Sequence, residues 1–109
     1  MWNEGVDRSV YIGRGVVFNG SIHAPERVVI NGHFEGELNA PTVIVSSQAV
    51  VHGVTTADTI KVQGTLNDVV ICRDLLEIAS TGSINGNVTY RVLDVEQGGK
   101  ILGVVNSLV

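Results

Sequence analysis

Three histidines are the residues in this sequence most suggestive of chemistry: His23, His33 and His52. Three imidazoles can hold a zinc ion that activates a water molecule. If the chain alternates as a strand does, all three side chains face outward. Each lies near a glycine, but at a different place: three residues after it, three before it and one before it. Because different places in a repeat do not stack, we expect ordinary surface histidines and no metal site.

Glu35 and His52 occupy equivalent places, one residue before a glycine, and such a pair could act as a catalytic acid and base. Catalytic pairs normally lie in a pocket with a third group that orients them. Asparagines fill the same place elsewhere in the chain, and their amides can hydrogen-bond from one strand to the next. We therefore expect an outward polar ladder without a pocket, shared with Asn19, Asn67 and Asn85.

Cys72 and the segment Gly13–Gly15 complete the candidates for chemistry. A single cysteine excludes an intramolecular disulfide and a cysteine-based zinc site. Cys72 shares its place in the repeat with Ala24 and Ala40, so we expect it to point inward as a small apolar residue. Gly13–Gly15 resembles part of a phosphate loop, but no helical pattern follows it, which favours a simple bend. The sequence therefore predicts no catalytic residue, no cofactor and no metal.

A repeat of about 17 residues must position all of these side chains. Five glycines and Asp68 can be set in register as markers, at separations of 16, 17, 15, 18 and 17 residues. The residues two before and two after each marker are apolar, with Thr55 the exception, and a further apolar pair lies between successive markers. The markers are Gly20, Gly36, Gly53, Asp68, Gly86 and Gly103. The column before them holds Phe18, Phe34, Val51, Leu66, Ile84 and Ile101, and the column after them holds Ile22, Leu38, Thr55, Val70, Val88 and Val105.

These columns predict an all-β fold that winds in one direction. Hairpins would need an Asn-Gly or Asp-Gly pair at each reversal, and such pairs do not recur regularly along the chain. At roughly 3.3 Å per residue, one coil has a perimeter of about 56 Å, enough for three short faces. The uneven period argues against a left-handed hexapeptide solenoid. We therefore expect a right-handed parallel β-helix of about six coils with a triangular cross-section, and glycines at bends where φ is positive or where coils approach closely.

Composition narrows the class of protein. The 109 residues are 44% apolar and 17% charged, which indicates one folded domain rather than a disordered chain. A formal charge of −4 disfavours a nucleic-acid partner. Neither a signal-peptide pattern nor an 18-residue apolar run is present, so a cytoplasmic location is the expectation.

The sequence resembles the bactofilins, bacterial polymer-forming cytoskeletal proteins. The resemblance rests on INGHFEGELNAPTVIVSSQAVVHGV, on IKVQGTL and on LEIASTGSINGNVTYRVLDVEQGGKILGV, and it covers residues 12–105. It implies a right-handed triangular β-helix that assembles end to end into filaments without a nucleotide. It also implies a scaffold role in cell shape, appendage placement or recruitment of cell-wall enzymes.

The resemblance further implies a short N-terminal segment that contacts the cytoplasmic membrane at its inner face. Met1 and Trp2 are the candidates for this contact, although Glu4 and Asp7 stand where basic residues are usual. The long tails that flank the core in many members are almost missing here, which weakens any expectation of partners bound through tails. We expect a short tail over residues 1–9, the β-helix over 10–105 and a C-terminal end over 106–109.

The two ends of the predicted coil stack are the candidate functional surfaces. A solenoid normally needs polar caps, because its last coils expose an apolar cross-section and unpaired backbone groups. We see no cap in the sequence, so both ends are expected to bind other copies. At the N-terminal end the predicted contacts are Val10, Tyr11, Ile12, Val16, Val17 and Phe18. At the C-terminal end they are Ile101, Leu102, Val104 and Val105, followed by Leu108 and Val109.

Two other functions remain open from the sequence. One is a solenoid adaptor that binds a partner along one face without polymerising. The other is a solenoid enzyme, such as an acyltransferase or a lyase, which would need a cleft built by long insertions or a catalytic cluster. Coils as even as these leave room for neither, so a self-assembling scaffold is the prediction.

Overall fold

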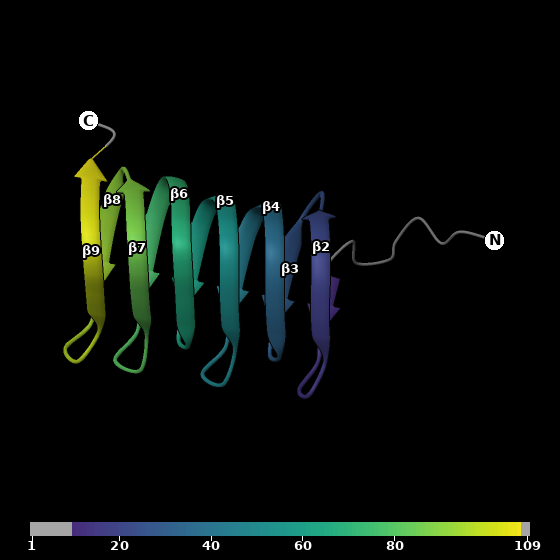
Figure 1. Cartoon of the computed structure of the whole chain (residues 1–109). Helices are drawn as coiled ribbons and strands as arrows, with labels where there is room; N and C mark the ends of the chain where they lie inside the picture. Colours follow the sequence, from purple (N-terminus) through teal and green to yellow (C-terminus); the bar gives the residue numbers. More distant parts are fainter. Residues whose placement is uncertain (1–9, 108–109) are drawn as a thin grey trace.

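Nine parallel strands wind into a single β-solenoid in the computed structural model, which describes residues 10–107. Figure 1 shows the chain rising along the near face, descending along the far face and advancing steadily from the N-terminal to the C-terminal end, which is a right-handed path. The predicted all-β, right-handed parallel β-helix is thus confirmed. The strands are β1 (Val10–Ile12), β2 (Val17–His23), β3 (Arg27–Ile30), β4 (His33–Val45), β5 (Val50–Val62), β6 (Thr65–Ile78), β7 (Ser83–Tyr90), β8 (Val92–Val95) and β9 (Lys100–Ser107).

The strand register reproduces the columns expected from the sequence. Gly20 pairs with Gly36, Gly36 with Gly53, and Gly86 with Gly103. Asp68 pairs with Gly86, so it holds the marker place where the glycine is missing. The apolar columns beside the markers face the interior, where side chains from successive coils stack into one core. Its largest fully buried members are Phe34, Ile30, Leu38, Ile60, Leu66, Leu76, Ile78 and Ile84.

All five marker glycines adopt positive φ, and four of them, all but Gly20, lie directly against the backbone of the previous coil. Their φ angles lie between 116° and 139°, a region that side-chain-bearing residues rarely adopt. A Cβ atom added to Gly36 would overlap the carbonyl oxygen of Gly20, and one added to Gly53 would overlap that of Gly36. These glycines lie inside continuous strands rather than in the turns between them. The predicted positive φ and close approach are therefore both present, without a break in the strand.

Asp68 occupies the same marker position although it carries a side chain. Its φ of 78° is positive, which aspartate tolerates better than most residues. Its carboxylate Oδ2 accepts a hydrogen bond from the backbone N–H of Gly53, one coil earlier, at 2.9 Å. The side chain thereby supplies a coil-to-coil bond at the one marker that is not glycine.

Turn length and one bulge explain the uneven period. Four-residue turns such as Ser46–Ala49 and Ala79–Gly82 close with a backbone hydrogen bond, whereas β3–β4 and β5–β6 are joined by two residues. The longer turns project along one edge of the rod in Figure 1. Between β5 and β6 the register separation grows from 15 to 16 residues, because Arg73 and Asp74 together oppose Asp58.

Segment Gly13–Gly15 lies in one of the longer turns, as predicted.

Thr55 is the one polar side chain in the apolar column, and it is fully buried. Its hydroxyl makes no hydrogen bond among the described residues. Since an unsatisfied buried hydroxyl costs about 1–3 kcal/mol, we expect Thr55→Val to stabilise the fold by about 1 kcal/mol. Urea unfolding should show a higher midpoint with an unchanged slope. The control is Thr56→Val at the neighbouring outward position, which should change little; a lower midpoint for Thr55→Val would contradict the prediction.

Candidate self-association surfaces at the ends of the coil stack

The N-terminal end of the described chain is an open strand edge. Within residues 10–107, β1 pairs only with β3 and β2 only with β4, so both are edge strands among the described residues. Val17 is 65% exposed, and Tyr11 and Val16 are also exposed. The predicted contacts Val10 and Phe18 are half-buried against the core. An exposed apolar edge strand is a template for pairing with another chain.

Two of the predicted contact residues at this end, Phe18 and Ile12, pack against the core. Phe18 stacks on Phe34 of the next coil, with ring centroids 5.4 Å apart and planes 8° apart. Ile12 is only 4% exposed, so it supports the end from inside and presents little surface. The candidate contact surface at this end therefore consists mainly of Tyr11, Val16 and Val17 around the half-buried ring of Phe18.

The C-terminal end is formed by β8 and β9. Within the described chain, β8 pairs only with β6 and β9 only with β7. Ile101 and Val105 continue the inward columns of Ile84 and Val88, yet Ile101 is half-buried and Val105 is 42% exposed. In the interior coils, from β4 to β7, the same columns are buried, so the apolar cross-section is open here.

The other predicted contacts at this end face a different way. Leu102 and Val104 pair with Asn85 and Asn87 on the outer side of β9, and Leu102 is 59% exposed. They border the open cross-section rather than fill it. Sequence reasoning missed Val95 as part of this surface: it is 41% exposed at the end of β8, although its column was recognised as an inward one.

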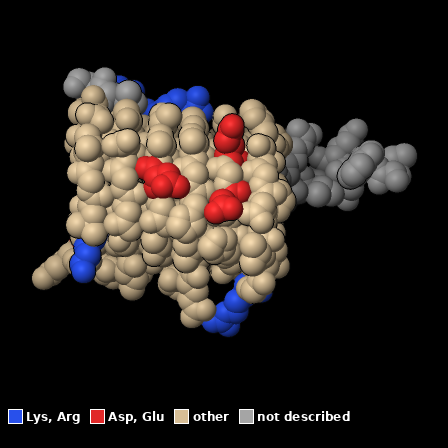
Figure 2. Space-filling model, viewed as in Figure 1, with Lys and Arg blue, Asp and Glu red and all other residues tan. Residues whose placement is uncertain are grey.

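Charged side chains border both ends without entering the apolar columns: Arg27 donates to the hydroxyl of Tyr11 at 3.3 Å, and the last coil carries Arg91, Asp94, Glu96 and Lys100. Figure 2 shows a mostly uncharged face, with acidic groups near its middle and basic groups towards its edges. The inward columns that open at the two ends carry no charge. Apolar burial and backbone pairing are thus the interactions that these ends offer. Met1, Trp2, Leu108 and Val109, and the tail over residues 1–9, lie outside the described residues.

The predicted polar ladder is present. Glu35 pairs with both Asn19 and His52 in adjacent strands. The amide Nδ2 of Asn85 donates to Oδ1 of Asn67 at 3.2 Å, which is a direct coil-to-coil bond. This arrangement agrees with a structural role for the ladder.

The histidines do not stack in one column, as expected, but one pair of them lies close together. The rings of His33 and His52 lie 5.5 Å apart and are tilted by 35°. Their places in the repeat differ by two residues, but both face outward on adjacent strands, so they meet diagonally. His23 is exposed at the end of β2. Among the described residues, no group of three or more histidines, cysteines or acids could hold a metal ion.

Cys72 points inward and is fully buried, as predicted. Its Sγ lies 3.3 Å from the carbonyl oxygen of Asp58, at the bulge between β5 and β6. Burial away from water raises the pKa of the thiol, and the acidic groups of Asp74 and Asp58 raise it further. A thiol held in its protonated form is a poor nucleophile.

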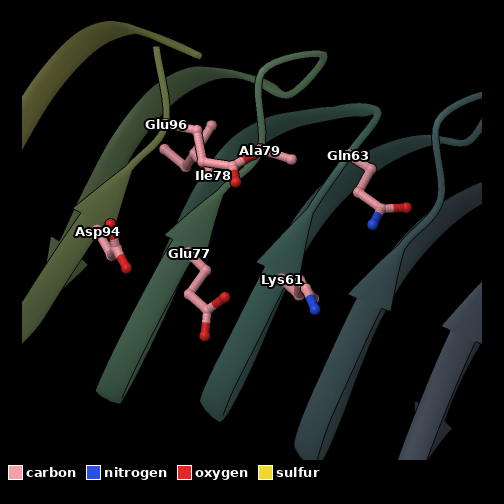
Figure 3. Close-up of a pocket in the computed structure, with 7 residues that line it drawn as sticks. All are labelled: Lys61, Gln63, Glu77, Ile78, Ala79, Asp94 and Glu96. Atoms are coloured by element: carbon pink, nitrogen blue, oxygen red, sulfur yellow. The ribbon is translucent and has the colours of Figure 1, made fainter. Parts of the chain in front are cut away.

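A hollow lies on the far face, towards the C-terminal end, and Figure 3 shows its lining. Side chains from β5, β6 and β8, and from the turns that follow these strands, surround about 240 Å³ of space. One acid is already engaged, since Glu96 Oε1 accepts from the backbone N–H of Ser80 at 3.1 Å. The hollow contains no serine, threonine, cysteine or histidine that could act as nucleophile or base in a triad. Its lining residues are Lys61, Gln63, Glu77, Ile78, Ala79, Asp94 and Glu96.

Comparison with known proteins gives one family. The family model Bactofilin, described as polymer-forming cytoskeletal, matches residues 10–106. The comparisons with curated proteins and with solved structures found no match. In the described part of the chain, no helix has the length and apolar character needed to cross a membrane.

Proposed function

Because the chain belongs to the bactofilin family of polymer-forming cytoskeletal proteins, we propose that it is a bacterial scaffold that assembles end to end into filaments without a nucleotide. In the cytoplasm, these filaments support cell shape or localise envelope-associated and cell-wall proteins. The function involves no catalytic step and no cofactor.

The open apolar cross-section at the C-terminal end is the observation that best supports this proposal. Val95 and Val105 occupy columns that are buried in the interior coils, yet both are more than 40% exposed here. Another copy placed on this end would bury them and could extend the sheet from the outer edges of β8 and β9. A rod with a self-associating surface at each end grows without closing, which gives a filament rather than a ring.

The orientation of successive copies follows from the family resemblance. It favours like-to-like contacts, with N-terminal ends joined to each other and C-terminal ends joined to each other. A filament of this kind has no polarity. The inner face of the cytoplasmic membrane is its proposed location, with Met1 and Trp2 as the contact residues. One such contact is weak, but many copies along a filament add their affinities.

Negative-stain electron microscopy of the purified full chain tests the proposal. The protein should form uniform thin filaments at neutral pH without nucleotide, over a range of salt concentrations. Light scattering should rise steeply with protein concentration. Discrete particles at every concentration and salt would overturn the proposal and favour a solenoid adaptor that binds its partner along one face.

A further inference from the structure

The diagonal pair His33 and His52 is a preformed arrangement of two metal-ligating side chains. The rings lie 5.5 Å apart on the outer face of β4 and β5, and both side chains are half-buried, which limits the positions that they can adopt. Glu35 stands on the same face, paired with His52 and two residues beyond His33. Parallel pairing over thirteen-residue strands holds the two backbones at a fixed distance.

The ring separation suits a shared metal ion. An imidazole nitrogen binds zinc at about 2.0–2.1 Å, which places the ring centre about 3.2 Å from the metal. Two such rings at a tetrahedral angle have centres about 5.2 Å apart. The observed separation of 5.5 Å is close to this value, so two imidazoles spaced as His33 and His52 are can share one ion.

The charges around the pair are compatible with a cation. Val17 and Val50 pair with His33, and Glu35 pairs with His52. Arg14 lines the same hollow as His33, but its guanidinium donates to Oε1 of Gln48 through Nε at 3.2 Å and Nη2 at 2.8 Å. The nearby carboxylate of Glu35 favours a positive charge at the pair.

We propose that His33 and His52 form a two-histidine site for a late first-row divalent cation such as Zn²⁺ or Ni²⁺. Imidazole is a preferred ligand of these ions, and water fills the remaining coordination positions. This site lies on the side of the rod and does not depend on the proposed end-to-end assembly.

Isothermal titration of the untagged full chain with NiCl₂, and separately with ZnCl₂, tests the site. One ion should bind per chain at pH 7.5. His33→Gln and His52→Gln should each weaken binding at least tenfold. His23→Gln is the matched control, because His23 is exposed on the same rod but distant in register, and it should bind as the parent does.

Several results would overturn the proposal. These are the absence of binding up to millimolar metal, unchanged binding in His33→Gln and His52→Gln, or an equal loss in His23→Gln. One ion per two chains would also overturn it, because it would indicate a site between copies. Far-ultraviolet circular dichroism of each variant checks that the fold is intact, and the glutamine replacements at half-exposed outward positions should preserve it.

Discussion

Replacing Gly53 by alanine is expected to cost the fold about 3 kcal/mol or more. The added Cβ would overlap the carbonyl oxygen of Gly36 and lie 2.9 Å from its carbonyl carbon. Those atoms belong to backbone that is hydrogen-bonded in a parallel ladder, so they cannot move aside as a flexible side chain could. The φ of 116° adds conformational strain of about 1–3 kcal/mol, and overpacking adds a similar amount. Domains of ordinary stability have only about 5–15 kcal/mol in total.

Two other glycines separate the steric cost from the cost of the backbone angle. Gly15 also has a positive φ, of 80°, but a Cβ there would meet nothing within 4 Å. Gly15→Ala should therefore cost about 1–2 kcal/mol. Gly13→Ala should be nearly neutral, since the nearest atom is Cγ2 of Val16 at 3.9 Å. Urea unfolding at several protein concentrations measures all three; a Gly53→Ala variant within 1 kcal/mol of the parent would refute the steric argument.

Replacing Ile101 by arginine is expected to abolish filaments and leave short soluble species. Ile101 pairs with the buried Ile84 and continues its column into the open C-terminal cross-section. A neighbouring copy would enclose this side chain, and an unpaired charge enclosed in an apolar contact costs about 3 kcal/mol or more. That loss raises the concentration needed for assembly by about a hundredfold or more. Sedimentation and electron microscopy measure the outcome.

Control variants distinguish a blocked contact from a damaged fold. Asn87→Arg places the same charge on an exposed outward position one coil away from the end, and filaments should persist. Ile101→Ala removes apolar area without adding charge, so it should weaken assembly less than Ile101→Arg does. Because Ile101 is only half-buried, the circular dichroism spectrum of the arginine variant should remain that of the parent. Filaments of Ile101→Arg indistinguishable from those of the parent would show that this residue lies outside the contact.

Much of the fold could be predicted because each coil requires the same types of residue at equivalent positions. In each coil, a glycine with positive φ lies between two inward apolar residues. These glycines mark the register, as Gly20, Gly36 and Gly53 do. Asp68 could be placed in the same column because its neighbours Leu66 and Val70 kept the pattern. The inward position of Cys72 followed from the alanines in its column.

The remaining features depend on contacts that a column-by-column comparison does not contain. His33 and His52 meet diagonally between columns, so stacking within a column could not predict them. The bulge opposite Asp58 depends on how two coils of unequal length are accommodated at a corner. Val95 belongs to an apolar pair like those of the interior coils, so its sequence pattern does not distinguish it. Its exposure arises because no further described coil covers it.

The glycine column also has a mechanical consequence. Along this line, the backbone of one coil lies directly against the backbone of the next, as Gly36 does against Gly20 and Gly103 against Gly86, with no side chain between them. Side chains can change rotamer under load, whereas a carbonyl oxygen against a Cα atom cannot shorten its contact. The rod should therefore resist bending towards this line more strongly than bending away from it. Filaments built from such rods would inherit a preferred direction of curvature, set by where the glycines lie around the coil.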